Sequence, residues 1–96
     1  MNEFTFRNPP ETLTRAQIEA RIPAPPEGWT AQDDLALMEG LFKLVGLMRI
    51  AVSIRKPFDA VQERFLQLRR AAVEGAGPFS LSAQTDLLKI MRERAE

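Results

Sequence analysis

The sequence contains no cysteine, no histidine and no tyrosine among its 96 residues. Without cysteine there are no disulfides and no thiol nucleophile, and without histidine as well the usual ligands of zinc are missing. A Ser-His-Asp triad and histidine acid–base chemistry are excluded for the same reason. Neither sign of charge is in excess, because 13 Lys and Arg balance 13 Asp and Glu, so a chain-wide basic field for nucleic acid or anionic membrane is absent. These absences predict a protein that is not an enzyme and holds no metal or cofactor.

Long apolar runs are also missing. Every apolar stretch is far shorter than the about 20 residues of a membrane-spanning helix, and the opening MNEFTFRNPPE lacks the basic-then-apolar pattern of a signal peptide. What is present fits one small globular domain, since 45% of the residues are hydrophobic. We therefore expect a protein without a membrane segment.

Residues 1–27 are predicted to precede the main domain as an arm, a short helix and a Pro-rich connector. The arm, residues 1–11, carries Phe4 and Phe6 ahead of a structure-breaking Asn-Pro-Pro. These two rings either fold back onto the core or serve as a hook for a partner.

The short helix in this segment has a recognisable start and stop. Thr14 and Gln17 have the spacing of a capping box, in which each side chain satisfies the backbone N–H of the other. The helix is expected to continue to about Arg21. It must end there because prolines follow at positions 23, 25 and 26.

Residues 28–74 are predicted to hold three helices. The first is capped by Thr30 and carries Asp33 and Asp34 in its first turn, where carboxylates meet the positive end of the helix dipole. Two adjacent acids could also suggest a divalent ion. Neighbouring side chains on a helix diverge by about 100°, however, so the dipole interpretation is favoured. Gly46 is expected to end this helix.

The second and third helices are read from their apolar spacing. Residues 47–54 (LMRIAVSI) have apolar side chains at i, i+3, i+4 and i+7. Their Val and Ile also suit a strand, but helix is favoured because the flanking pattern is helical. Pro57 breaks this helix, and the third runs from residue 58 to about 73.

Residues 79–96 are predicted to form a last helix, capped by Ser80 or Ser82, that packs on or extends the three-helix core. The fold class is therefore all-α. Trp29, Leu47 and Phe65 recur every 18 residues, so we expect these bulky side chains to meet at one centre, where they would bury the most apolar area per residue. The predicted core consists of Trp29, Leu35, Met38, Leu47, Ile50, Val61, Phe65 and Leu68.

The three-helix segment resembles a Myb/SANT domain. Residues 29–37 (WTAQDDLAL), 47–51 (LMRIA) and 62–65 (QERF) are similar to the family words W-[ST]-x-x-[DE]-[DE]-x-x-L, W-x-x-I-A and R-x-R-W. The second and third aromatic positions of the family are Leu and Phe in this chain. The resemblance covers about residues 28–71.

A closer resemblance is to the N-terminal domain of microspherule proteins, a divergent Myb-like domain. The matching words are DDLAL at 33–37, PFD at 57–59, VQERF at 61–65, and the Phe-Ser and Leu-Leu pairs at 79–80 and 87–88. This chain departs from the family in a shorter connection between the first two helices and in Phe65, where the family has Trp. The resemblance implies a nuclear role in histone acetyltransferase or chromatin-remodelling assemblies.

The resemblance leaves two kinds of partner open, because SANT-type domains commonly bind proteins and Myb repeats commonly bind DNA. A Myb-type DNA reader places its third helix in the major groove. The cations for that role are Lys56, Arg64, Arg69 and Arg70, offset here by Asp59 and Glu63. The net charge of these residues is small, whereas tight DNA binding requires several phosphates to be neutralised, so the sequence gives only weak support for DNA binding.

A protein partner has more direct support in the sequence. Residues 40–54 carry only two charges, and a domain this small cannot bury all of their apolar side chains. Either the flanking helices cover the surplus in a closed five-helix unit, or a partner does. The protein-binding candidates are Phe42, Leu44, Leu87 and Met91. We therefore predict a non-catalytic adaptor in a nuclear chromatin complex, with DNA binding as the alternative.

Overall fold

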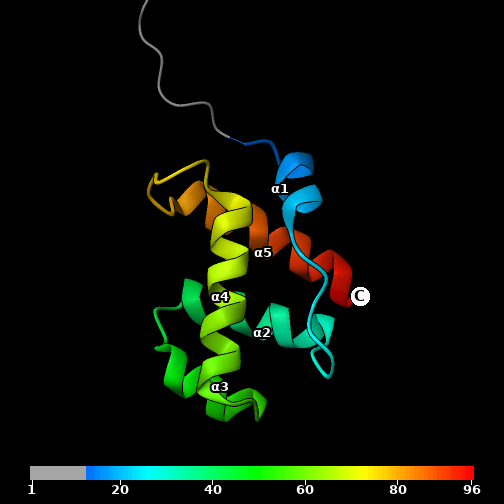
Figure 1. The fold of residues 1–96 in the computed structure, drawn as a ribbon, viewed down its shortest axis with the longest axis vertical. Helices are drawn as coiled ribbons and strands as arrows, with labels where there is room; N and C mark the ends of the chain where they lie inside the picture. Colours follow the sequence, from blue (N-terminus) through cyan, green and yellow to red (C-terminus); the bar gives the residue numbers. More distant parts are fainter. Residues whose placement is uncertain (1–12) are drawn as a thin grey trace, which may run out of the picture.

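The computed structural model describes residues 13–96, so the predicted arm with Phe4 and Phe6 lies outside the described residues. Within 13–96 the chain is all helical, as predicted, and residues 47–54 form a helix and not a strand (Figure 1). The helices are α1 (Arg15–Arg21), α2 (Ala31–Phe42), α3 (Leu47–Ile54), α4 (Phe58–Ala72) and α5 (Leu81–Ala95).

Side-chain caps begin three of these helices. Thr14 with Gln17, and Thr30 with Asp33, form reciprocal capping boxes with donor–acceptor distances of 2.8 to 3.1 Å. The Ser80 hydroxyl accepts a hydrogen bond at 3.1 Å from the backbone N–H three residues further on. Each cap satisfies backbone donors that the first helical turn leaves free. The caps predicted at Thr14 and Thr30 are therefore confirmed, and of the two alternatives for the last helix the cap is Ser80.

The turn between α2 and α3 differs from the prediction that Gly46 ends the helix. α2 ends earlier, at Phe42, in a Schellman motif in which the N–H of Val45 donates to the carbonyl of Gly40 at 2.8 Å. The left-handed position of this motif is held by Leu44, with φ of 63°. Gly46 instead immediately precedes α3.

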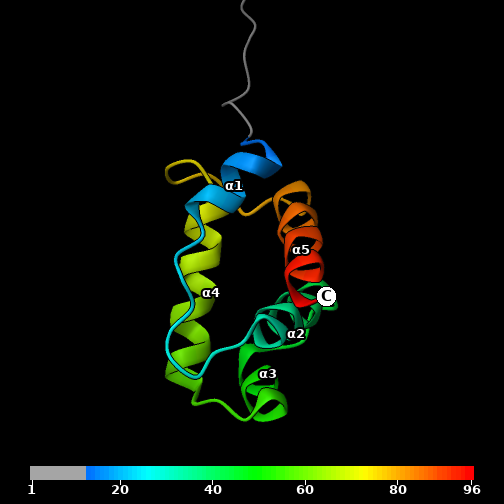
Figure 2. The same ribbon diagram turned by 90° about the vertical axis from the view of Figure 1, so that its right-hand side faces the viewer.

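The helices enclose one core from two sides. Figure 2 shows α4 on one side and α5 with α2 on the other, with α1 and α3 at opposite ends. The most extensive helix–helix interface joins α2 and α5; α3 packs on both α2 and α4, and α1 packs on both α4 and α5. The fully buried apolar side chains are Ile18, Leu37, Met38, Val61, Leu68, Leu87, Ile90 and Met91. The last helix thus supplies three of the eight.

The predicted core residues lie at different depths. Trp29, Met38, Ile50, Val61 and Leu68 are buried, whereas Leu35, Leu47 and Phe65 are half-buried against the core. The expected centre at Trp29, Leu47 and Phe65 therefore needs correction. The fully buried positions come from α1, α2, α4 and α5, and Phe65 sits at the edge of the core with its ring 6.2 Å from that of Phe79.

Candidate protein-docking surface

Two of the predicted protein-binding residues are not on the surface. Leu87 and Met91 are fully buried, because α5 lays its apolar face on α2. Neither can contact a partner without unfolding of the domain, so their assignment is corrected. The other two candidates are exposed: Phe42 retains 41% of its accessible surface and Leu44 retains 92%.

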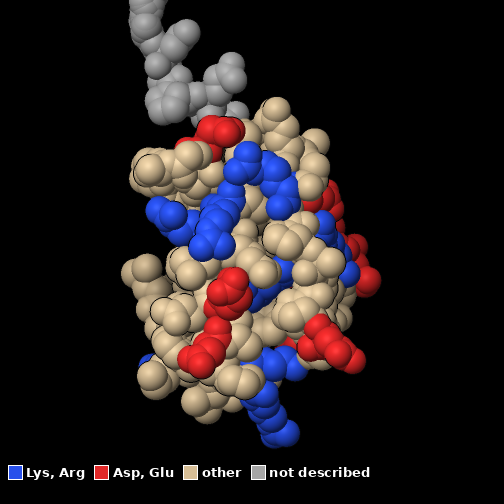
Figure 3. Space-filling view, viewed as in Figure 1, with Lys and Arg blue, Asp and Glu red and all other residues tan. Residues whose placement is uncertain are grey.

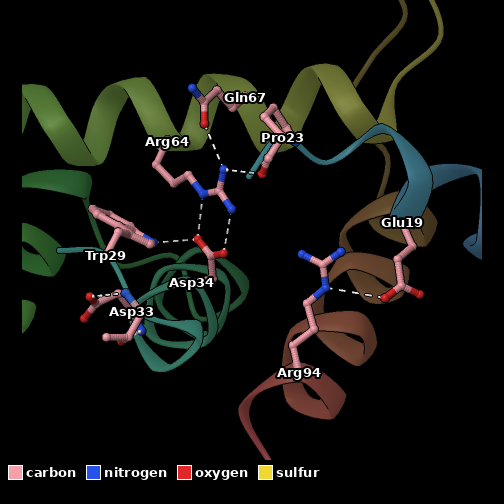
Figure 4. A network of polar contacts seen from close by, with 9 residues as sticks. Glu19, Pro23, Trp29, Asp33, Asp34, Arg64, Gln67 and Arg94 are labelled. Atoms are coloured by element: carbon pink, nitrogen blue, oxygen red, sulfur yellow. Dashed lines mark hydrogen bonds and ion pairs between the residues drawn. The ribbon is translucent and has the colours of Figure 1, made fainter. Parts of the chain in front are cut away.

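Arg64, predicted to contact DNA, is buried as well. Its Nε and Nη2 each donate to a different oxygen of the Asp34 carboxylate at 2.8 Å, which makes a two-pronged ion pair between α4 and α2 (Figure 4). Trp29 Nε1 donates to the same carboxylate at 2.7 Å. The remaining nitrogen of Arg64 donates to the Pro23 carbonyl at 3.0 Å and to Gln67 Oε1 at 2.8 Å. The predicted role of Arg64 at a DNA interface is therefore wrong.

Asp34 also differs from its predicted role. The helix dipole was the expected reason for this residue, yet Asp34 is 2% exposed and its carboxylate accepts three hydrogen bonds. Burial of an unpaired carboxylate is strongly unfavourable, so Arg64 and Trp29 make this position possible. Asp34 and Arg64 lie 30 positions apart in the chain, and no short-range pattern signals such a pairing.

The other predicted DNA contacts are only partly available. Lys56 Nζ donates to the Gly28 carbonyl at 2.5 Å and lies 3.6 Å from Asp33 Oδ2, so it joins the turn before α4 to the connector and to the first turn of α2. Arg69 donates to Gly77 at 3.4 Å, and Arg70 is exposed. Figure 3 shows basic side chains gathered at the end of α4 near α1, with acidic side chains over the middle of the same face. This surface is mixed in charge.

The exposed apolar side chains point to another part of the molecule. Within the described part of the chain, the large hydrophobic residues with exposed side chains are Phe42, Leu44, Met48, Val52, Phe58 and Leu81. Five of the six lie between residues 42 and 58, from the last residue of α2 through α3 to the first residue of α4. Exposed apolar side chains gathered in one region mark interaction sites.

We call the centre of this region the α3 surface and define it by Leu44, Met48, Arg49 and Val52. Met48 is 62% exposed and Val52 is 76% exposed. They are one helical turn apart, so they lie on one face of α3. α3 itself lies at the end of the molecule opposite to α1 (Figures 1 and 2), where no other described helix covers this face.

Two shallow hollows adjoin the α3 surface. One, of about 320 Å³, is lined by Met48, Arg49, Val52 and Ser53. The other, of about 370 Å³, lies between α2 and α3 and shares Arg49 and Ser53 with the first. Together the two hollows make this surface uneven, so that it can receive side chains of a partner.

The helical period of α3 also predicts that Met48 and Val52 are exposed. The inward stripe of α3 is formed by Leu47, Ile50, Ala51 and Ile54, which are buried or half-buried. Any apolar residue of this helix outside the stripe must face away from the core. Met48 and Val52 are such residues, so the same spacing that predicted the helix also predicts its exposed apolar face.

Leu44 has a left-handed backbone conformation, which is expected to lower the stability of the domain. A substitution at this position tests that expectation. A left-handed residue with a Cβ is disfavoured by about 1–2 kcal/mol, and Leu44 is too exposed to gain much by burial. We expect Leu44→Gly to raise the free energy of unfolding by about 0.5–1 kcal/mol, after the entropy that glycine loses on folding. Urea denaturation would measure this. Val52→Gly, in regular helix, should lower stability instead.

The described residues offer no metal site or membrane helix. Within 13–96, no group of three or more His, Cys, Asp or Glu side chains is placed to hold a metal ion. None of the five described helices has the combined length and apolarity needed to cross a bilayer.

In comparisons with known proteins, no family model, no curated protein and no solved structure matches this chain.

Proposed function

We propose that this chain is a non-catalytic protein-interaction module that binds its partner across the α3 surface. The observation that carries the proposal is the concentration of exposed apolar side chains on and around α3. A monomeric domain gains nothing from leaving Leu44, Met48 and Val52 in water, whereas a partner that covers them gains the free energy of their burial. A left-handed, exposed Leu44 adds support, because strained positions gather at functional sites.

We further propose that the module is Myb/SANT-like and acts in a nuclear chromatin-regulating complex, such as a histone acetyltransferase or remodelling assembly. Support comes from the sequence words that resemble the microspherule and Myb/SANT families. Trp29, Asp34 and Arg64 belong to those words, and their side chains meet in one buried network. Two of the sequence segments that carry the resemblance, residues 29–37 and 62–65, are therefore in direct contact through these side chains.

DNA binding through α4 has less support than this. Arg64 is buried, Lys56 is engaged within the domain, and acidic side chains share the face. A DNA-binding surface needs several free cations to meet phosphates. We therefore propose that the partner binds at α3. Binding of nucleic acid is one of the results that the experiments below can detect.

The proposal is tested by affinity capture from nuclear extract. We expect the tagged wild-type chain to recover subunits of a chromatin complex, and the double variant Met48→Asp/Val52→Asp to lose them, because a buried unpaired carboxylate is strongly unfavourable in an interface. Leu81→Asp is the matched control, since Leu81 is similarly exposed, at 68%, but lies on α5. Recovery of the same proteins by both variants would contradict the assignment of the surface.

A further inference from the structure

We infer that the segment which binds the α3 surface is an acidic amphipathic helix of the partner protein. Its apolar side chains cover Met48 and Val52, and its carboxylates face the cations that border α3. This inference rests on the proposed function, because it names the partner of the same surface.

Basic side chains outnumber acidic ones around α3. Residues 40–58 contain four Lys and Arg and no Asp or Glu, although the whole chain is neutral. The acids that border this range are Glu39, which lines the hollow between α2 and α3 and lies 3.9 Å from Arg92, and Asp59 in the first turn of α4. Lys56 is engaged with the connector. Lys43, Arg49 and Arg55 are exposed, and none forms an ion pair with any other residue in the range 13–96. Charge complementarity therefore calls for a partner that brings carboxylates to this end of the molecule.

The arrangement of apolar and basic groups suits a helix. Met48 and Val52 form a ridge one turn long, with a hollow beside it and a second hollow between α2 and α3. Arg49 lines both hollows. An amphipathic helix presents apolar side chains at i and i+4 with charged residues on either flank, so it can fill the hollows and pair with Arg49 at the same time.

Two other occupants fit the surface less well. A second copy of this chain, docked through the same face, would bring Arg49 and Arg55 close to their own symmetry mates, and like charges repel. Lipid-binding helices present a broad apolar face with Trp, Phe or Leu. The α3 surface shares an exposed leucine, Leu44, with such helices. It differs from them in the hollows of about 320 and 370 Å³ that adjoin it, which can receive protein side chains.

A displayed library of random peptides tests the inference without a known partner. The immobilised full chain is used to select peptides of about 16 residues, enough for about four helical turns. We expect the selected sequences to be enriched in Glu and Asp and to carry large apolar residues at i, i+4 spacing. Binding should be lost with Met48→Asp/Val52→Asp, while Leu81→Asp should bind as the wild type does.

Charge reversal tests the acidic component separately. The variant Arg49→Glu/Arg55→Glu should bind a selected peptide about tenfold more weakly at low salt, and the difference should shrink at about 0.5 M salt, where exposed charges are screened. The same peptide with Lys in place of Glu should bind this variant better than it binds the wild type. That exchange of preference is expected only if carboxylates of the peptide face Arg49 and Arg55.

The outcomes separate this inference from the proposed function. Neutral or basic peptides that still require Met48 would overturn the acidic partner and leave the docking surface intact. A library without any binder sensitive to Met48→Asp would overturn the inference, and the affinity capture decides the proposed function independently. Binding of the wild type to vesicles of equimolar phosphatidylserine and phosphatidylcholine, lost in Met48→Asp/Val52→Asp, would overturn it in favour of a membrane surface.

Discussion

Replacing Asp34 by alanine is expected to lower the free energy of unfolding by about 3–5 kcal/mol, because it leaves the buried guanidinium of Arg64 without its counter-charge. Arg64 is 1% exposed and both of its bonds to Asp34 are 2.8 Å long. Trp29 Nε1 loses its acceptor as well. Since a domain of this size has only about 5–15 kcal/mol of stability in total, chemical denaturation should reveal a large shift in midpoint.

Asp33→Ala is the matched control for this effect. Asp33 is the neighbouring acid in the same helical turn, but its carboxylate accepts from the backbone N–H of Thr30 as part of the cap. Its loss should lower stability by about 1 kcal/mol. A double variant with both buried charges removed, Asp34→Leu/Arg64→Met, should be less destabilised than Asp34→Ala, because it leaves no unpaired ion. Equal small losses for Asp33→Ala and Asp34→Ala would show that the ion pair does not join α2 to α4 in solution.

Replacing Leu87 by alanine is expected to lower the free energy of unfolding by about 2–5 kcal/mol, the range for deleting a buried leucine side chain. Leu87 is fully buried on α5, which packs on α2, α1 and α4. Thermal or urea unfolding of the purified chain would measure the loss. This result would establish that α5 belongs to the core and is not an appended helix.

Leu81→Ala is the control for Leu87→Ala, because it removes the same atoms from an exposed leucine of the same helix. Its effect should stay within about 0.5 kcal/mol, as for most surface substitutions. If the two variants lost equally little stability, Leu87 would lie on a surface, as the sequence alone suggested, and the packing of α5 on α2 would be wrong.

Local signals predicted the helices well. Thr14 and Thr30 were identified from cap spacing, and the segment 47–54 from its apolar period. Such signals act within one or two turns of chain, so they can be read from a single sequence. The end of α2 was missed because Leu44, and not a glycine, takes the left-handed position of the cap.

Contacts between distant segments were not predictable in the same way. Leu87 and Met91 looked like surplus apolar surface, because the sequence does not state that α5 covers α2. Arg64 looked like a free cation on the polar face of its helix, because its partner Asp34 belongs to another helix. Of the exposed residues of the α3 surface, Leu44 was predicted from the apolar surplus, whereas the exposure of Met48 follows from the helical period of α3.

Site-specific photo-crosslinking tests the claim that partners bind at α3 more directly than any other measurement. A photoreactive phenylalanine analogue is placed at Val52 on α3, or at Arg70 on the exposed face of α4, and the full chain is irradiated in cells. We expect covalent adducts with a protein from position 52 and none from position 70. Adducts formed only from position 70, or with nucleic acid in place of protein, would contradict this claim.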